Sequence, residues 1–249
     1  MDKQNKDIVG FLLLGGTGSR LGNLVLSINK HLLSISEVPM AFYAIKKFLA
    51  AGITEIICVV GMEHYNTLIE SIGFGSKFAC TIRYEFQEKP GGIAEAIALC
   101  EDRVRDRKIC VILGDNIFED DLRHHITHFL NKKESCRLFL KEVAEPKRFG
   151  VPSFDKKMRI TKITEKPEVS DSSYAITGIY LYDQNVWNYI KKCNPSERGE
   201  LEITDVNNFY VKAKKATYSI LQGFWSDAGT IDSYVRTNKY FIDKYLNNQ

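Results

Sequence analysis

The sequence is short of the features that mark secreted, membrane-spanning or nucleic-acid-binding proteins. The apolar run near the N-terminus, residues 8–14, is too brief for the core of a signal peptide, and no small-residue cleavage site follows it. No apolar run is long enough to cross a bilayer. An excess of one charge is also missing, because 34 Lys and Arg face 31 Asp and Glu, for a formal net charge of +3. We therefore expect a cytoplasmic protein that binds neither membrane nor nucleic acid.

Cysteine is present, but never in a spacing that serves metal or redox chemistry. No two cysteines form a C-x-x-C pair, which removes support for a zinc site or a redox motif. Several cysteines lie inside apolar runs, where cysteine usually acts as a small core residue. We expect free thiols in a reducing compartment. The six cysteines are Cys58, Cys80, Cys100, Cys110, Cys136 and Cys193.

The chain has enough apolar material for a substantial core. Its 249 residues, 44% hydrophobic and 26% charged, suit one large domain or two small ones. The first half alternates between strand-like and helix-like segments, and this alternation predicts a parallel sheet covered by helices. The predicted strands of this half are 8–14, 55–60, 81–86 and 108–113, and the predicted helices are 39–51, 63–71, 93–104 and 121–132.

The second half has a different character, because several strands follow one another with few helices between them. Repeats, low-complexity segments and a clear linker are missing from the sequence, so we expect a single mixed α/β domain over residues 1–249. The predicted strands here are 137–143, 158–163, 174–182 and 217–221, and the predicted helices are 185–191, 203–213 and 231–246.

A glycine-rich stretch, "GGTGSRL", comes directly after the first predicted strand. Glycines let backbone N–H groups approach phosphate oxygens, and Arg20 adds a planar cation. The Walker A pattern is excluded because no Gly-Lys-Ser/Thr follows, and the dinucleotide fingerprint fails because Leu21 stands where its third glycine belongs. The loop alone fits a phosphate cradle or a tight strand-to-helix turn equally well.

Further motifs along the chain make a more specific pattern. The sequence "GGTGSRL" at 15–21 is followed by Lys30, "GDN" at 114–116, "EKP" at 165–167 and "WSDAGT" at 225–230. Together with "RFGV", "SYAITGIYLYD" and "ERGELEITD", this ordered set resembles the sugar nucleotidyltransferases, and within them the glucose-1-phosphate thymidylyltransferases. The resemblance covers about residues 8–240.

The resemblance implies a fold and a reaction. The fold would be a single-domain, Rossmann-like nucleotidyltransferase with a mixed, mostly parallel central sheet, whose nucleotide-binding half is about 1–135 and whose sugar-binding half is about 136–249. The reaction would be transfer of a thymidylyl group from dTTP to α-D-glucose 1-phosphate, giving dTDP-glucose and pyrophosphate for surface polysaccharide synthesis. Relatives form homotetramers built from dimers, so a homo-oligomer is expected.

The resemblance also assigns the nucleotide side of the site. The backbone of the glycine loop would surround the triphosphate, while Arg20 and Lys30 would stabilise charge on the departing pyrophosphate. Two carboxylates far apart in sequence, Asp115 and Asp227, would share one Mg²⁺. The amide of Gln87 offers both a donor and an acceptor for the edge of a thymine or uracil. The other nucleotide-binding positions are Gly15, Gly16, Gly18 and Gly92.

On the sugar side, the resemblance places Lys166 against the phosphate of the sugar. Glu165 and the backbone of Gly150 would bind sugar hydroxyls, and Ile176 and Tyr180 would line the pocket. The attacking group is already a phosphate oxyanion at neutral pH, so no general base is required. The catalytic residues would be Arg20, Lys30 and Asp115.

Each assignment has a simpler alternative. Lys30 could be a solvated surface lysine, and Gln87 a surface glutamine at a strand end. Asp115 could cap a turn, Asp227 could be the N-cap of the last helix, and "EKP" could be an exposed turn. His124 and His128 have metal-binding spacing, but nothing near them in sequence completes a site, so we expect solvated helix residues.

The chain departs from many relatives around the nucleotide. Leu14 replaces an alanine, Ser34 replaces a proline, and Gly91 stands where relatives carry an acidic residue; residues 22–25 also differ. A loop without proline costs more to order. Two alternatives follow: a sister enzyme that uses another triphosphate or sugar phosphate, and a non-catalytic sugar-nucleotide sensor.

Overall fold

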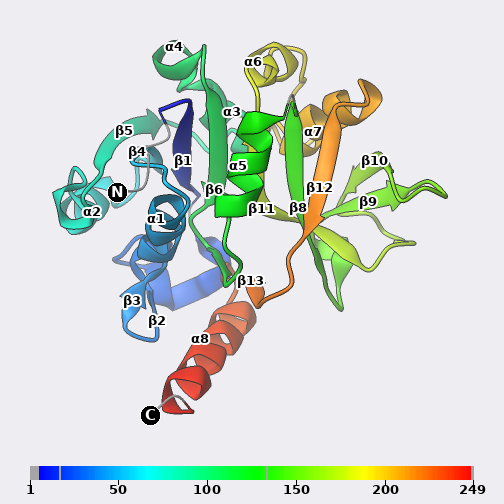
Figure 1. Cartoon of the computed structure of the whole chain (residues 1–249). Helices are drawn as coiled ribbons and strands as arrows, with labels where there is room; N and C mark the ends of the chain where they lie inside the picture. Colours follow the sequence, from blue (N-terminus) through cyan, green and yellow to red (C-terminus); the bar gives the residue numbers. More distant parts are fainter. Residues whose placement is uncertain (1–5, 17, 133, 248–249) are drawn as a thin grey trace.

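The structure is a computed structural model that describes residues 6–16, 18–132 and 134–247. The first five residues of the N-terminal segment and Thr17 of the glycine loop lie outside the described residues. The central feature is a seven-stranded sheet with the order β12-β8-β11-β6-β1-β4-β5 (Figure 1). Its strands are β1 (Ile8–Leu14), β4 (Glu55–Gly61), β5 (Thr81–Gln87), β6 (Lys108–Leu113), β8 (Cys136–Glu142), β11 (Tyr174–Tyr182) and β12 (Ala216–Ile220).

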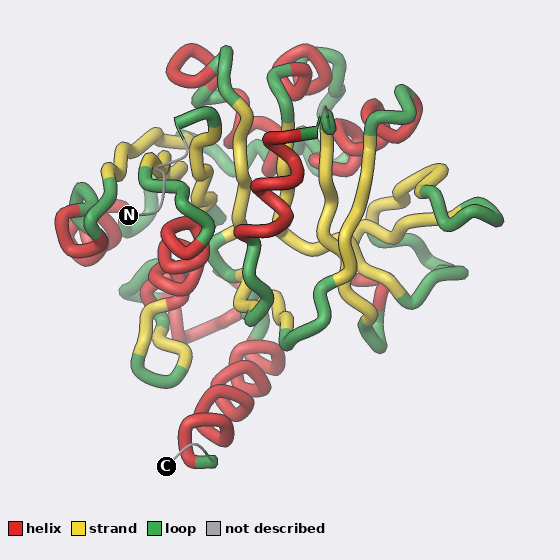
Figure 2. Tube along the Cα trace, in the orientation of Figure 1, coloured by secondary structure: helices red, strands yellow, loops and turns green. Residues whose placement is uncertain are grey.

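The sheet is mixed and mostly parallel, as the sequence predicts. β11 runs antiparallel to both of its neighbours, β6 and β8. The other four pairings in the sheet are parallel. One sheet therefore continues from the first half of the chain into the second, and both halves contribute strands to it (Figure 2).

Helices cover both faces of the sheet. They are α1 (Met40–Ala50), α2 (Tyr65–Ile72), α3 (Ile93–Ala98), α4 (Glu101–Val104), α5 (Arg123–Asn131), α6 (Asn185–Ile190), α7 (Ile203–Lys212) and α8 (Ile231–Leu246). α1 and α5 pack on one face, and α3, α6 and α7 pack on the other (Figure 1). α8 projects from the body of the molecule at the end that holds the C-terminus (Figure 1).

The burial of β1 explains why its sequence is a continuous apolar run. All seven of its residues are buried. Leu12 and Leu14 point into the core on the side of α1, while Phe11 and Leu13 point into the core on the side of α3. A central parallel strand with helices on both faces needs apolar residues at every position.

Several short elements were not predicted. They are the strand pairs β2 (Ser34–Ile35) with β3 (Val38–Pro39) and β7 (Asn116–Phe118) with β13 (Trp225–Asp227), and the strand β9 (Gly150–Phe154). β9 pairs with β10 (Ile160–Glu165), which overlaps the predicted strand 158–163. The 3-10 helices are η1 (Ser19–Val25), η2 (Lys30–Leu32), η3 (Ser76–Phe78) and η4 (Pro146–Arg148). The predicted helix 93–104 is two helices, because Cys100 leaves the helical conformation with φ −97° and ψ 0°.

The lengths of the helices and the state of the cysteines were also subjects of the sequence analysis. Among the described residues, the helices are all too short or too polar to pass through a bilayer. All six cysteines are free thiols, and Cys58, Cys100, Cys110 and Cys136 are buried, as their apolar surroundings in the sequence predict.

Candidate active site

A cleft of about 470 Å³ opens at the carboxyl edge of the sheet. Three of the neighbouring parallel strands end there: β1 runs into Gly15, β6 is followed by Asp115, and β5 ends at Gln87. Ligands of open α/β sheets bind beyond the carboxyl ends of strands, so this is the expected position. The lining also includes Arg20, Lys30, His31, Lys166, Arg198 and Glu200.

The glycine loop turns the chain from β1 into η1 and forms one wall of the cleft. Gly16 and Gly18 have φ angles of 91° and 67°, which side chains disfavour. A Cβ atom on Gly18 would lie 3.3 Å from Cβ of Lys30, so the loop packs directly against that lysine. The loop is thus a tight turn, and Gly15, Gly16 and Arg20 also face the cleft.

Lys30 and Asp115 form a largely buried ion pair in the cleft. Nζ of Lys30 lies 2.6 Å from Oδ2 of Asp115, and the two side chains are 11% and 13% exposed. Asn116 donates to the other carboxylate oxygen over 3.1 Å. Burial opposes ionisation of Asp115, but the Lys30 ammonium and these hydrogen bonds hold the pKa of the carboxyl well below its usual range. Lys30 is therefore not a solvated surface lysine.

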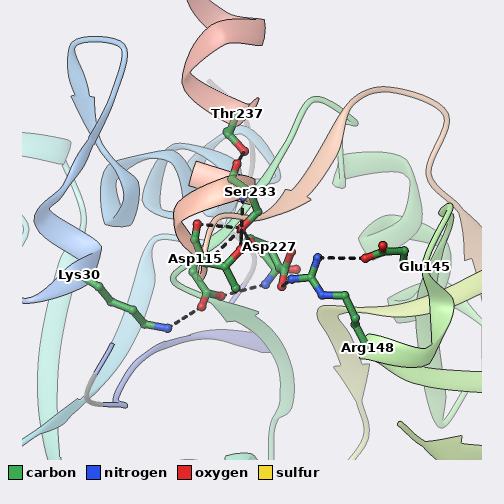
Figure 3. Close-up of polar contacts among 9 residues, drawn as sticks. Lys30, Asp115, Glu145, Arg148, Asp227, Ser233 and Thr237 are labelled. Atoms are coloured by element: carbon green, nitrogen blue, oxygen red, sulfur yellow. Dashed lines mark hydrogen bonds and ion pairs between the residues drawn. The ribbon is translucent and has the colours of Figure 1, made fainter. Parts of the chain in front are cut away.

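Asp227 comes to the same place from a strand more than a hundred residues further along the chain. In the pairing of β13 with β7, Asp227 lies opposite Asn116, and the N–H of Ala228 donates to the carbonyl of Asp115 over 2.8 Å. Figure 3 shows the two carboxylates side by side. Burial and the charge of Asp115 raise the pKa of Asp227, while Arg148 and Arg20 partly oppose this.

The alternative role for Asp227 as a helix cap is wrong. Thr230 is the N-cap of α8 and forms a capping box with Ser233. The Ser233 hydroxyl also donates to the backbone carbonyl of Asp227 over 2.6 Å (Figure 3). The helix start thus holds the backbone of Asp227 and leaves its carboxylate free to face Asp115 and Arg148.

Arg148 is a functional candidate that the sequence reasoning did not assign. It belongs to η4, and its Nη2 lies 3.5 Å from Oδ2 of Asp227 (Figure 3). Each of the two carboxylates therefore has a cation beside it, Lys30 at Asp115 and Arg148 at Asp227. The "RFGV" motif was the available signal, but nothing in that motif indicated a partner in "WSDAGT".

His31 is a second residue that sequence reasoning missed. It is 1% exposed, its ring lines the cleft beside Lys30, and its Nδ1 lies 2.8 Å from Oδ1 of Asn29. Burial, aided by the charge of Lys30, lowers the pKa of His31 to about 3, so the ring is neutral at pH 7. Gly114 makes room for it, because a Cβ atom there would lie 2.7 Å from Cδ2 of His31.

Gln87 is buried, with 7% exposure, so it is not a surface glutamine. Its Nε2 donates to the carbonyl of Gly92 over 3.3 Å and to Oε2 of Glu95 over 2.6 Å. Its Oε1 faces the glycine loop, since a Cβ atom on Gly15 would lie 3.1 Å from it. The predicted base-reading residue therefore lies against the glycine loop.

The residues predicted for the sugar lie together on the other side of the cleft. Lys166 lines the cleft, and its Nζ is 3.7 Å from Oε1 of Glu165. Oε2 of Glu165 accepts a hydrogen bond of 2.6 Å from Thr204, a residue that the sequence analysis did not name. A Cβ atom on Gly150 would lie 3.3 Å from Oγ1 of Thr204 and 3.4 Å from Oε2 of Glu165, so a side chain there would crowd both groups.

Ile176 and Tyr180 lie deeper than the other predicted sugar-site residues. Both are buried in the core under the α3 face of the sheet, at 7% and 4% exposure. Burial raises the pKa of the Tyr180 hydroxyl, and the charges of Glu165 and Asp115 act in the same direction. Tyr180 is therefore within electrostatic reach of both Glu165 and Asp115.

Residues 198–205 close the remaining side of the cleft. The sequence analysis gave this segment no role. Arg198 and Glu200 line the cleft. The segment is fixed to the start of α3, because the N–H of Leu201 donates to Gly91 over 2.8 Å and its carbonyl accepts from Ala94 over 3.3 Å.

The histidines of α5 take no part in this cleft. Nδ1 of His128 is 2.9 Å from Oε1 of Glu134, which makes it part of an ion-pair network with Arg137. Within the described part of the chain, no group of three or more His, Cys, Asp or Glu side chains could hold a metal ion. His124 is exposed, as predicted for a solvated helix residue, whereas His128 is half-buried in this network.

The fold and the cleft together define an enzyme that transfers part of a nucleotide. More particularly, the chain belongs to the nucleotidyl transferase family, whose model matches residues 9–244. The chain is 34% identical over 227 residues to a glucose-1-phosphate thymidylyltransferase of Neisseria meningitidis, covering 90% of this chain and 79% of that protein. It is 36% identical over 231 residues to one of Xanthomonas campestris pv. campestris, covering 90% and 77%.

A solved structure is also similar over nearly the whole chain. It is a protein of Bacillus anthracis that has been provisionally named a glucose-1-phosphate thymidylyltransferase and was crystallised in complex with sucrose. The two chains are 46% identical, the TM-score is 0.89, and the match covers 94% of each chain. The family, the mixed sheet and the activity as a nucleotidyltransferase are therefore the predictions that these comparisons confirm.

Proposed function

We propose that the chain transfers a thymidylyl group from dTTP to α-D-glucose 1-phosphate and releases pyrophosphate. The observation that supports the proposal is that the glycine loop, the Lys30–Asp115 pair and Lys166 line one cleft, as binding of a triphosphate beside a sugar phosphate requires. The names of the relatives support the choice of dTTP and glucose 1-phosphate. The product would serve dTDP-sugar and surface polysaccharide synthesis.

In this proposal the cleft acts by positioning and by charge. The sugar-phosphate oxygen attacks the α-phosphorus of dTTP, a new P–O bond forms, and the bond to the bridging oxygen of the β-phosphate breaks. The negative charge passes to pyrophosphate, where Arg20 and Lys30 stabilise it. Lys166 holds the attacking phosphate in line. No proton needs to be removed, so the step does not depend on His31, whose low pKa of about 3 makes it a weak base.

The two carboxylates fit a magnesium ion. Asp227 has a raised pKa partly because Asp115 is charged beside it, and a divalent cation relieves that repulsion. Mg²⁺ is commonly bound by one or two carboxylates together with substrate phosphates, so a site without a third protein ligand suits it. When bound, Mg²⁺ would supply positive charge to the α-phosphate. Lys30 and Arg148 occupy the carboxylates in the structure and would then turn to the phosphates.

Turnover with a panel of substrates tests the proposal. The protein is incubated with dTTP, UTP, CTP, ATP and GTP, each paired with glucose 1-phosphate and with amino and deoxy sugar phosphates, and pyrophosphate release is measured. We expect the highest kcat/KM with dTTP and glucose 1-phosphate. A different best pair would identify the sister enzyme, and binding of dTDP-glucose without turnover on any pair would identify the sensor.

The remaining expectations belong to the same proposal. We keep residues 1–135 as the nucleotide half and 136–249 as the sugar half of one domain. The family resemblance leads us to propose a homo-oligomer, a dimer or tetramer, in the cytoplasm. Sedimentation equilibrium over a range of protein concentrations tests the assembly, and a monomer at all concentrations would contradict it.

A further inference from the structure

The amide of Gln87 is held in one orientation by two hydrogen-bond acceptors. Its Nε2 lies 2.6 Å from Oε2 of Glu95 and 3.3 Å from the carbonyl of Gly92. A carboxylate and a carbonyl can only accept, so both require the NH₂ group of the amide on their side. A flipped amide would place its oxygen against two other oxygens, which is unfavourable. The carbonyl oxygen of Gln87 must therefore face the other way, toward Gly15 and the cleft.

Glu95 reaches Gln87 only because residue 91 is glycine. A Cβ atom on Gly91 would lie 1.9 Å from Oε2 of Glu95 and 2.2 Å from its Cδ, well inside contact distance. Gly91 has no left-handed φ angle, so the position needs glycine for space and not for backbone conformation. The carboxylate of Glu95 thus fills the volume that a side chain at position 91 would take.

We propose that Glu95 is a positioning residue for base recognition, which fixes Gln87 as a hydrogen-bond acceptor toward the nucleotide. The proposal rests on the proposed function, which places the base against Gln87. An acceptor there favours a base that offers a ring N–H, as N3 of thymine or uracil does. Cytosine offers a lone pair at its N3, so two acceptors would meet. The Gly91–Glu95–Gln87 contact therefore selects 2,4-dioxopyrimidine nucleotides against cytidine nucleotides.

The test measures binding of dTTP and dCTP to the whole protein by calorimetry, without sugar phosphate, so that no turnover is needed. In Glu95→Gln, the new amide can donate to Gln87 and let its amide turn round. We expect the preference for dTTP over dCTP to fall by about tenfold, the value of one hydrogen bond. Glu101→Gln removes a helix carboxylate that pairs with Lys191 and Arg105 outside the cleft, and it should leave the preference unchanged.

Gly91→Ala is a second and independent perturbation. The added methyl displaces the flexible carboxylate of Glu95 without changing any charge, so the protein folds and the dTTP preference falls as in Glu95→Gln. A purely structural role for Glu95 would lower the melting temperature of both variants and leave the ratio of the two affinities as in the wild type.

The outcomes separate this inference from the proposed function. A wild type that binds dTTP and dCTP alike overturns the inference, and so does a ratio that stays within about twofold of wild type in both variants. If the substrate panel still gives turnover in that case, the enzyme stands without this role for Glu95. If no pair in the panel reacts but both variants lose the preference, the role of Glu95 stands and the transferase proposal falls.

Discussion

Lys30 pairs with Asp115 in the structure, and this interaction excludes the phosphate contact that the proposed reaction gives it. In the structure it neutralises Asp115 over 2.6 Å, and in the proposed reaction it must leave that carboxylate for a phosphate. The exchange is favourable only if another cation takes its place, because a buried carboxylate without a partner is costly. At the residue scale, the ion pair thus keeps the Asp115 carboxylate ionised, which is the form that the proposed metal ion requires.

Asp115→Asn tests the role of this carboxylate. The amide keeps the size of the side chain but loses the charge, so we expect turnover to fall by about 10²–10³-fold or more while the fold stays intact. Initial rates of pyrophosphate release and a circular dichroism spectrum measure the two effects. Asp102→Asn, at a side chain that is 93% exposed on α4, is the matched control. Near-normal rates in Asp115→Asn would remove this residue from the metal site.

Lys166→Ala tests the sugar side of the cleft. The ammonium of Lys166 is 46% exposed and is 3.7 Å from Glu165, so its removal should cost little stability. We expect the KM for glucose 1-phosphate to rise by about tenfold or more, with a much smaller change for dTTP. Lys162→Ala removes an exposed lysine of β10, the strand that ends just before Lys166, and should change neither constant. A larger effect on dTTP than on the sugar phosphate would contradict our assignment.

His31 predicts how stability depends on pH. Its folded pKa of about 3 lies below the ordinary value of 6.5, so the unfolded chain binds more protons between these values. Stability contributed by neutral His31 is complete above pH 6.5 and is lost as the pH falls toward 3. Between pH 7 and pH 5, we expect the free energy of unfolding of the wild type to fall by about 2 kcal/mol more than that of His31→Asn.

Urea unfolding at both pH values, without nucleotide, measures this difference. His64→Asn changes an exposed histidine at the start of α2 and should behave as wild type does. If the wild type and His31→Asn lost the same free energy of unfolding, the pKa of His31 would not differ between the folded and unfolded chains, and the prediction would be wrong.

At the scale of elements, the site depends on a strand pair that brings together distant parts of the chain. β7 and β13 have three residues each, and the indole of Trp225 donates to Oδ1 of Asn116 over 2.9 Å across 109 positions of sequence. Ser233 then ties β13 to the first turn of α8. The position of Asp227 therefore follows from the helix start as much as from the strand.

The sequence predicts the large elements well and the small ones poorly, for a physical reason. β1, β6 and β11 are long enough for burial to set their composition, and their predicted bounds match the structure. Strands of three residues such as β7 carry no periodicity, so no local signal shows that Asn116 pairs with Asp227. Only the resemblance brought Asp115 and Asp227 together. Arg148 and Glu95 were missed because their importance lies in contacts with residues from other elements.

Ser233→Ala tests the link between α8 and the cleft. It removes half of the capping box and the hydrogen bond to Asp227, and we expect a loss of about 1–2 kcal/mol of unfolding free energy and a several-fold fall in kcat. Thr237→Val is the matched control, because Thr237 bonds only to the carbonyl of Ser233 within the same helix. That variant should lose stability without losing activity. An unchanged kcat in Ser233→Ala would show that β13 is held by its pairing alone.

At the scale of the whole molecule, the cleft is assembled from both halves of the chain. Gly15 and Asp115 follow parallel strands of the first half, whereas Lys166 and Arg198 belong to segments that flank β11 and α7 in the second half. These residues come together only when the sheet is complete. A ligand that contacts both halves therefore binds the folded chain and not the unfolded one.

This linkage makes thermal stability a readout for the ligand. With dTTP and Mg²⁺ at about 100 times the dissociation constant, binding adds about 2.7 kcal/mol, which for a chain of this size raises the melting temperature by roughly 5–10 °C. We expect Mg²⁺ with dTTP to stabilise the wild type more than either alone, and this cooperation to vanish in Asp115→Asn. A sensor would be stabilised by dTDP-glucose equally well with and without Mg²⁺, since it has no need of a metal ion for transfer. Scanning calorimetry with each ligand, in the presence and absence of Mg²⁺, therefore separates an enzyme that uses its two carboxylates from a binding protein that merely retains them.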